Sequence, residues 1–248
     1  MELLLVAVGV AIGGMSGFFG IGGGTMLVPT LMMLGFDIKS AIGISVMQMV
    51  FSSLYGSWIN HRKGHLDLGE GMVIGLGGSL GALGSGWLVK IVPSIVLEVA
   101  FVGVVAFALY RFFKAPAHID ENLGHDLPKP VLFMVGAVIG LLAISMGIGG
   151  SILLTPILVG LLHYPLKKAV SAGLFFVVFS SVSGFVSLSI TGHIDYWHGF
   201  LVGISSLAGV HIGIHMASRT GHKRHKSALV VLYIVILSLM LKKILESA

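Results

Sequence analysis

The chain has 248 residues, of which 56% are apolar and only 10% are charged, and its mean hydropathy is +1.02. Because a soluble domain carries about 25% charged residues, this composition excludes a soluble enzyme. The formal net charge of +5 does not indicate a nucleic-acid partner, since the basic residues lie in short stretches between apolar runs, where they orient a chain in a bilayer. The lack of cysteine excludes disulfides and thiolate metal sites.

Ten apolar segments, separated by short polar stretches, follow one another along the chain. A helix needs about 20 apolar residues to cross a hydrocarbon core about 30 Å thick. Several charge-free runs reach that length without the two-residue alternation of a barrel strand. We therefore predict an all-α integral membrane protein. The first half holds segments 3–18, 25–36, 41–60, 71–89 and 94–113, and the second holds 130–145, 151–163, 169–190, 196–217 and 227–245.

The two halves repeat each other at a spacing of 127 to 128 residues. The matched stretches are 20–23 with 147–150 (Gly-Ile-Gly-Gly), 51–53 with 179–181 (Phe-Ser-Ser) and 64–67 with 192–195 (Gly-His-x-Asp). Polar loops match as well as apolar segments, so chance similarity of low-complexity sequence is a poor explanation. We predict a first transmembrane repeat at 1–113, a cytoplasmic linker at 114–129 and a second transmembrane repeat at 130–248.

A cluster of glycines interrupts the first long charge-free run of each half. The 34 residues from Leu3 to Phe36 would form a helix of about 51 Å, which is too long for one crossing. Each glycine destabilises a helix interior by roughly 1 kcal/mol relative to alanine. The clusters at 20–24 and 147–150 should therefore break the helix, and Pro29 and Pro156 suit the first turn of the helix that follows. Each half is predicted to open with a glycine-broken hairpin.

The positive charges support this hairpin topology. If both runs fold back, four basic residues lie on one side of the membrane, and the other side holds eleven, namely Arg62, Lys63, Arg111, Lys114, Lys129, Lys167, Lys168, Arg219, Lys223, Arg224 and Lys226. If both cross once, the split becomes seven against eight. Because positive loops stay in the cytoplasm, we expect both termini on the non-cytoplasmic side and two inverted five-segment repeats.

Two helix breaks at matching positions of inverted repeats indicate a substrate site near the middle of the membrane. The helices that begin after the breaks, around Thr25 and Ser151, present unpaired N–H groups and a partial positive charge, which favour an anion. In an alternative interpretation, the glycines only allow neighbouring helices to pack closely.

Polar side chains within the segments add further candidates. Ser45, Gln48 and Ser52 fall on one helical face, and hydroxyls and amides can donate to an anion without a buried cation; alternatively, such serines bond back to their own helix. We predict no catalytic residue, metal ligand or cofactor. The predicted substrate-binding residues are Gly20, Gly22, Gly23, Gly24, Thr25, Ser45, Gln48, Ser52, Gly147, Gly149, Gly150, Ser151 and Ser180.

Three other features of the sequence bear on function. His211 and His215 lie four residues apart on one helical face, where they could relay protons, pack or, with a further ligand, bind a metal, and their role stays open. Asp67 and Asp195 of the Gly-His-x-Asp turns are expected to cap helices. The sequence has no nucleotide-binding loop ending in Gly-Lys-Ser/Thr, no HExxH and no GxSxG motif, so we expect no enzyme.

The sequence Gly-Phe-Phe-Gly-Ile-Gly-Gly-Gly at 17–24, followed by Pro29, resembles the TauE/SafE family, also called the sulfite exporter or toluene-sulfonate uptake permease family. The second copy at 146–151, followed by Pro156, does so too, although Met146 replaces Phe19 and Ser151 replaces Gly24. The resemblance covers essentially the whole chain. It implies a multi-pass transporter of the inner membrane for sulfur-containing anions such as sulfite or organosulfonates, with proton coupling as one option.

Three hypotheses compete. The first is a secondary transporter, expected to work as an exporter, whose partners are a small anionic substrate and the lipid bilayer. The second is a passive anion channel, or a carrier of other small carboxylate or inorganic anions. The third is a membrane subunit that serves a partner. The sequence leaves the substrate, direction, coupling ion and the choice between monomer and homodimer open.

Overall fold

The structure is a computed structural model, and it describes residues 1–20, 22–62, 69–114, 128–160, 166–219 and 222–247. Within these ranges the chain forms α-helices and no strand, which confirms the predicted all-α class. The helices are α1 (Glu2–Phe19), α2 (Gly24–Met33), α3 (Ile38–Arg62), α4 (Gly69–Leu83), α5 (Ser85–Ile91), α6 (Ser94–Lys114), α7 (Lys129–Ser145), α8 (Ser151–Gly160), α9 (Leu166–Ile190), α10 (Tyr196–Arg219) and α11 (His222–Ser247).

These helices agree with the predicted segments to within a few residues, with one correction. The predicted segment 71–89 is divided at Gly84 into α4 and α5. The Ser187 hydroxyl of α9 donates to the Leu83 carbonyl at 2.5 Å and accepts from the Gly86 N–H at 3.0 Å. A side chain inserted into the backbone ladder is a known cause of such an interruption. Most of linker 114–129, the end of segment 151–163 and Asp67 lie outside the described residues.

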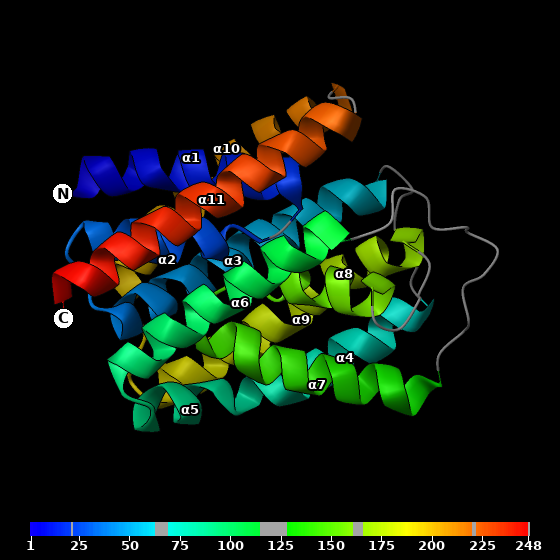
Figure 1. The fold of residues 1–248 in the computed structure, drawn as a ribbon, viewed down its shortest axis with the longest axis horizontal. Helices are drawn as coiled ribbons and strands as arrows, with labels where there is room; N and C mark the ends of the chain where they lie inside the picture. The colour runs from blue at the N-terminus through cyan, green and yellow to red at the C-terminus, as the bar shows by residue number, and fades with distance from the viewer. Residues whose placement is uncertain (21, 63–68, 115–127, 161–165, 220–221, 248) are drawn as a thin grey trace.

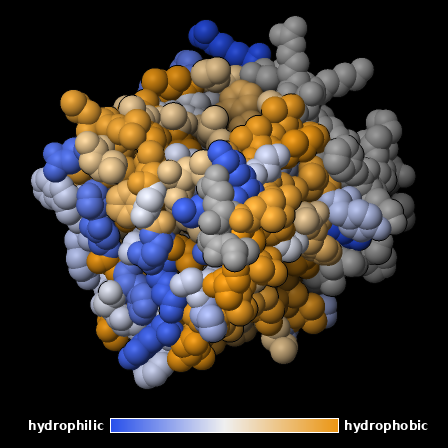
Figure 2. Space-filling model, turned by 60° about the vertical axis from the view of Figure 1, so that its left-hand side comes forward, coloured by the Kyte–Doolittle hydropathy of each residue, from blue (hydrophilic) through white to orange (hydrophobic). Residues whose placement is uncertain are grey.

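The helices have the length and surface of membrane spans. In the described part of the chain, five helical stretches are long and apolar enough to cross a bilayer: Glu2–Phe19, Ile38–Ile59, Gly71–Ile91 (which joins α4 and α5), Ser94–Arg111 and Tyr196–Ala217. Large apolar side chains stay exposed along α1, α4, α6, α7, α10 and α11. Figure 2, in which the end that holds the termini is turned toward the viewer, shows apolar side chains over much of the surface and hydrophilic side chains at that end. Soluble monomers rarely expose apolar surface on this scale.

Both termini lie at one end of the bundle, and the end of α6 and the start of α7 lie at the opposite end (Figure 1). At the end that holds the termini, hereafter the terminal end, Trp197 donates to Glu2 at 3.0 Å, and Lys39 donates to the Lys90 carbonyl at 3.4 Å. Helix α1 starts at the terminal end and α7 at the opposite one, hereafter the linker end. This is the arrangement of inverted repeats that open with hairpins.

Helices of the first repeat pack against helices of the second around a common centre. Helix α1 lies along α10, the corresponding α7 lies along α4, and α3 crosses α9. Glycines allow the close contacts, since a Cβ on Gly13 would lie 2.1 Å from the Ser206 carbonyl oxygen, and a Cβ on the matching Gly140 would lie 2.3 Å from that of Gly78. The matching hydroxyls of Ser53 and Ser181 lie 3.3 Å apart. Equivalent residues that touch each other lie on the axis relating the repeats.

Candidate functional site

The predicted helix breaks are present and have the same backbone conformation in both repeats. Helix α1 ends at Phe19 and α2 begins at Gly24, while α7 ends at Ser145 and α8 begins at Ser151. Three glycines of each break have positive φ angles, a region that other residues rarely adopt. The angles are 69°, 75° and 56° at Gly20, Gly22 and Gly23, and 67°, 80° and 62° at Gly147, Gly149 and Gly150.

The two breaks contact each other. The Thr25 hydroxyl at the start of α2 donates to the Ile148 carbonyl at 3.1 Å, and the Ser45 hydroxyl of α3 donates to the Gly147 carbonyl at 2.9 Å. A Cβ on Gly24 would lie only 2.1 Å from that same Gly147 oxygen. Non-helical backbone inside a membrane needs such partners. The first repeat therefore supplies hydrogen bonds that hold the break of the second.

Two buried polar side chains beside the breaks have no hydrogen-bond partner among the described residues. Gln48 is 0% exposed, and both atoms of its amide are unpartnered. A Cβ on Gly23 would lie 2.9 Å from its Oε1 atom and 3.1 Å from its Nε2 atom, so the amide packs against the residue that precedes α2. Ser151, the first residue of α8, is 5% exposed and its hydroxyl is also unpartnered.

The remaining predicted hydroxyls bond within their own helices. Ser52 donates to the Met49 carbonyl at 3.4 Å, and Ser180 donates to the Phe176 carbonyl at 2.5 Å. Such local bonds leave the oxygen lone pairs unused but occupy the donor. Gln48 is therefore the predicted site residue whose side-chain amide has no hydrogen bond to any described residue at either polar atom.

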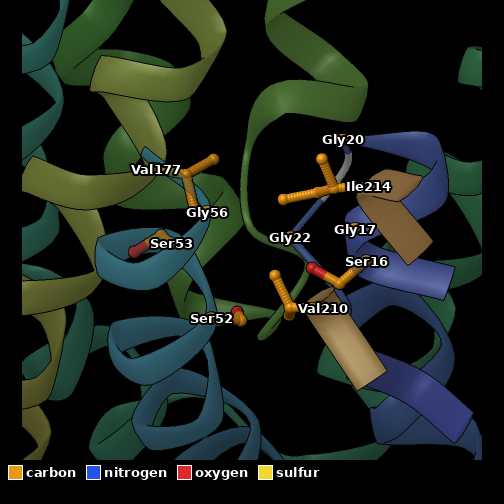
Figure 3. A pocket seen from close by; sticks show the side chains of 10 residues that line it. All are labelled: Ser16, Gly17, Gly20, Gly22, Ser52, Ser53, Gly56, Val177, Val210 and Ile214. Carbon is orange, nitrogen blue, oxygen red and sulfur yellow. The ribbon is translucent and has the colours of Figure 1, made fainter. Parts of the chain in front are cut away.

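A small pocket of about 40 Å³ lies beside the first break. Its lining comes from Ser16 and Gly17 near the end of α1, Gly20 and Gly22 of the break, Ser52, Ser53 and Gly56 of α3, Val177 of α9, and Val210 and Ile214 of α10, and none of these residues is charged (Figure 3). On a scale of about 10–15 Å³ per water, the pocket has room for roughly three water molecules. Its inner wall at Ser52 lies one helical turn from Gln48.

The structure divides nine of the thirteen predicted site residues into two groups, whereas Gly149, Gly150, Ser151 and Ser180 of the second repeat do not line the pocket. Gly20, Gly22 and Ser52 line the pocket, and Gly23 and Gln48, which do not line it, pack against each other. Gly24, Thr25, Ser45 and Gly147 form the contact between the breaks. Ser16, Gly17, Ser53 and Gly56 were missed by sequence reasoning. Ser16 and Gly17 lie about one helical turn before Gly20, and Gly56 lies one turn beyond Ser52, so helical spacing from the predicted residues could have found them.

His211 and His215 lie on α10, next to pocket residues Val210 and Ile214. Tyr55 and His211 form a hydrogen bond of 3.2 Å between the hydroxyl and Nδ1, and the two imidazole rings have centroids 6.1 Å apart. Among the residues that the structure describes, no group of three or more potential ligands could hold a metal ion. Both histidines are exposed, and neither lines the pocket.

A second pocket, of about 300 Å³, lies at the terminal end and is lined by Asp37, Lys39, Ser40 and residues 192–195. Asp195 accepts from the His198 N–H at 3.1 Å, which confirms that it caps α10. Burial acts to raise the pKa of Asp195, but the hydrogen bonds from His198 outweigh it, and the pKa lies below its ordinary value. Burial, and then the positive charge of Lys39, lower the pKa of His193.

Comparison with known proteins assigns this architecture to a family. The model of the family described as sulfite exporter TauE/SafE matches residues 5–240. The chain belongs to the TauE/SafE family. This confirms the resemblance carried by the duplicated glycine motif, and with the apolar helices it makes the chain a multi-pass membrane transporter.

Similar proteins match most of the chain. The "Probable membrane transporter protein YunE" of Bacillus subtilis (strain 168) is 25% identical and covers 96% of this chain and 94% of its own length. The "Probable membrane transporter protein MJ0441" of Methanocaldococcus jannaschii is 28% identical over 74% of this chain and 71% of its own length. The "Probable membrane transporter protein YdhB" of Bacillus subtilis is 23% identical over 85% and 88%. No solved structure matches the chain significantly.

Proposed function

We propose that the chain is a secondary transporter that exports small sulfur-containing anions, such as sulfite or organosulfonates, across the inner membrane. The observation that carries the proposal is the direct contact between two glycine-broken hairpins from inverted repeats. In secondary transporters, broken helices of inverted repeats build the substrate site near the middle of the bilayer. The family description names sulfite, which guides the choice of anion.

The breaks supply the electrostatics that an anion needs. The N-terminus of a helix carries roughly half a positive charge, although the N–H groups of Gly24 and Ser151, the first residues of α2 and α8, already donate to the Gly22 and Gly149 carbonyls. Helices α2 and α8 begin at the two breaks that touch each other. Their N-termini, together with the uncommitted Gln48 amide and Ser151 hydroxyl, can replace part of the hydration shell of an anion.

The distribution of basic residues supports an orientation in which both termini lie outside the cytoplasm. Arg62, Lys114, Lys129 and Arg219 lie at helix ends on the linker end, whereas Lys39, Lys90, Lys242 and Lys243 belong to the terminal end. Positive loops stay in the cytoplasm, so the linker end faces the cytoplasm and both termini face outward. In this orientation the pocket at residues 52–56 of α3 lies between the middle of the membrane and its cytoplasmic side. A reporter fused after Ala248 that proved to be cytoplasmic would contradict this orientation.

Flux measurements on purified protein test the proposal. The full chain, reconstituted in liposomes preloaded with sulfite or an organosulfonate, should show saturable efflux and counterflow, and an imposed pH gradient should reveal any coupling to protons. Empty liposomes serve as the control. Conductance that does not saturate would favour a channel. A lack of flux for every sulfite, sulfonate and carboxylate offered would contradict the transporter proposal.

A further inference from the structure

The position that faces the glycine break is polar in the first repeat and aromatic in the second. At the spacing of 128 residues, Gln48 corresponds to Phe176, and Gly23 corresponds to Gly150 at the spacing of 127. The contacts match this alignment. A Cβ on Gly23 would meet the Gln48 amide at 2.9 Å, and a Cβ on Gly150 would meet the Phe176 ring at 2.0 Å. Phe176 is fully buried, so its ring fills the place that an amide occupies in the other half.

The pocket beside the first break is also filled in the second repeat. Gly17 and Gly56 line the pocket, and their counterparts are Ile144 and Gly184. A Cβ on Gly56 would lie 3.9 Å from its nearest neighbour, the Val210 side chain, so space remains there. A Cβ on Gly184 would lie 2.3 Å from the Ile144 side chain. A Cβ on Gly17 would collide with the Val210 carbonyl oxygen, so the open space of the first repeat lies beside Gly56, and Ile144 fills the corresponding space beside Gly184.

The Gln48 amide is a buried group whose polar atoms both lack a hydrogen-bond partner among the described residues. A buried amide without a hydrogen bond destabilises a protein, and an apolar residue would avoid that penalty, as Phe176 does in the second repeat. The amide lies against the residue that precedes α2, a ten-residue helix, so it points at a helix N-terminus. An unpartnered donor and a helix N-terminus together form an incomplete coordination shell for an anion.

The pocket offers little charge to compensate a bound anion. No residue that lines it is charged, and the half positive charge at the N-terminus of α2 is opposed by the half negative charge at the C-terminus of α1, whose Ser16 and Gly17 line the pocket. A second negative charge on the anion would therefore remain uncompensated in a medium of low dielectric constant. The small volume of about 40 Å³ favours a compact anion.

We infer that the chain has one anion site, located in the first repeat, that Gln48 is its specificity-determining residue, and that it accepts a compact monoanion in preference to a dianion. Phe176 and Ile144 close the equivalent place in the second repeat. The inference rests on the proposed function, because it concerns the site through which that transport would run. For sulfite it means that the singly charged hydrogensulfite form is the one bound.

The wild-type chain gives the first test, without any substitution. Methanesulfonate and sulfate are tetrahedral anions of similar size that carry one and two charges, respectively. In thermal unfolding of purified protein, methanesulfonate should raise the midpoint at concentrations where sulfate does not, with at least about a tenfold difference in apparent affinity. Sulfite should bind more tightly below the pH at which hydrogensulfite loses its proton than above it.

The substitution Gln48→Met tests the residue itself. Methionine has a similar length and no polar amide, so the ligand-free variant should unfold at the same temperature as the wild type or a higher one. Its affinity for methanesulfonate should fall by about tenfold or more, since a hydrogen bond to a charged group is lost. A residue with a purely structural role would not combine unchanged or higher stability with weaker anion binding. The matched substitution Phe176→Leu should lower the midpoint and leave the affinity within about twofold.

The outcomes separate this inference from the proposed function. Equal binding of methanesulfonate and sulfate, or an unchanged affinity in Gln48→Met, would overturn the inference while flux through the protein still supported a transporter. The absence of binding and of flux for every anion would overturn both. If Gln48→Met fails to insert, the comparison of monoanion and dianion on the wild-type chain decides alone.

Discussion

The two repeats share a scaffold and differ in what they place beside it. Both breaks have three glycines with nearly the same φ angles, and both are followed by a ten-residue helix. Beside the first break lie an open pocket and the Gln48 amide, whereas Ile144 and Phe176 occupy the same places beside the second.

This difference suggests that the two repeats of a duplicated membrane fold have different roles in binding the substrate. The backbone must be satisfied inside the membrane in both halves, so the glycine breaks are kept in both. The second break receives hydrogen bonds from Thr25 and Ser45 of the first repeat, and the residue matching Thr25 is Ile152, which has no hydroxyl to return. We infer that the first repeat holds the substrate and supports the second, while the second contributes the N-terminus of α8.

The largest effects are expected from leucine at the breaks, where the two repeats should behave alike. Gly23→Leu and Gly150→Leu should each abolish transport, because both positions have positive φ and their Cβ atoms would collide with Gln48 and Phe176. The left-handed conformation alone costs a non-glycine residue roughly 1–2 kcal/mol. Flux in liposomes and elution of the purified variant measure the effect.

The matched control is Gly103→Leu on α6, where a Cβ would meet nothing within 4 Å. It should insert and transport like the wild type. Normal transport by both break variants would mean that the paired breaks are not the substrate site.

The next effect should distinguish the repeats. Phe176→Ala removes a fully buried ring, and such truncations destabilise by about 3–5 kcal/mol. The corresponding Gln48→Ala should destabilise much less, since its amide has no partner to lose among the described residues. Thermal unfolding in detergent compares the two variants. Equal losses would show that Gln48 is a packing residue like its counterpart.

A smaller contrast is expected at the pocket glycines. Gly184→Ala places a methyl group against Ile144 and should destabilise by about 1–3 kcal/mol through overpacking. Gly56→Ala should leave stability unchanged or raise it, because its Cβ would have space, but it should slow transport by narrowing the pocket. Unfolding midpoints and flux are measured on both variants. If Gly184→Ala slows transport and Gly56→Ala does not, the pocket used for transport would lie in the second repeat, contrary to our assignment.

The hydrogen bonds between the breaks should contribute about 1 kcal/mol each. Thr25→Val and Ser45→Ala remove the donors to the Ile148 and Gly147 carbonyls and leave those oxygens short of a partner. Unfolding midpoints in detergent measure the loss. The control is Ser189→Ala, whose hydroxyl bonds only to the Phe185 carbonyl of its own helix in the described structure, and which should be nearly neutral. No difference between the three variants would mean that the contact between the breaks adds little.

The smallest expected effect lies at the terminal end and depends on pH. The folded-state pKa of Asp195 lies below its ordinary value of 3.8, so its contribution is present above that value and is lost as the pH falls through the folded-state pKa. Asp195→Ala should lower stability by about 1 kcal/mol at neutral pH, the usual effect of losing a helix cap, and by less in acid. Unfolding midpoints of both proteins across this range check the sign. A loss that grows in acid would contradict it.

Much of the scaffold was predictable, because its causes are local in the sequence. Charge-free runs, glycine clusters and the positions of basic residues predicted the spans, both breaks and the location of both termini at the same end of the bundle. The division at Gly84 was not predictable, since its cause is Ser187, a residue of another helix.

The sequence predicted which residues lie near the site, but it did not predict which of their side chains already have hydrogen-bond partners. Ser45, Thr25 and Gln48 look equally free in the sequence. The first two are committed to carbonyls more than 100 residues away, and only the folded chain shows that Gln48 is not. The replacement of Gln48 by Phe176 and of Gly17 by Ile144 was visible in the repeat alignment. Its meaning required the contacts around Gly23 and Gly184.

The chain contains no cysteine, so single cysteines can report directly on which repeat the anion reaches. Ser52 lines the pocket, and its counterpart Ser180 does not. With Ser52→Cys and Ser180→Cys in reconstituted protein, a small membrane-permeant thiol reagent should modify only the cysteine at position 52, and methanesulfonate should slow that reaction. Equal modification and equal protection at both positions, or protection at position 180 alone, would contradict an anion site in the first repeat.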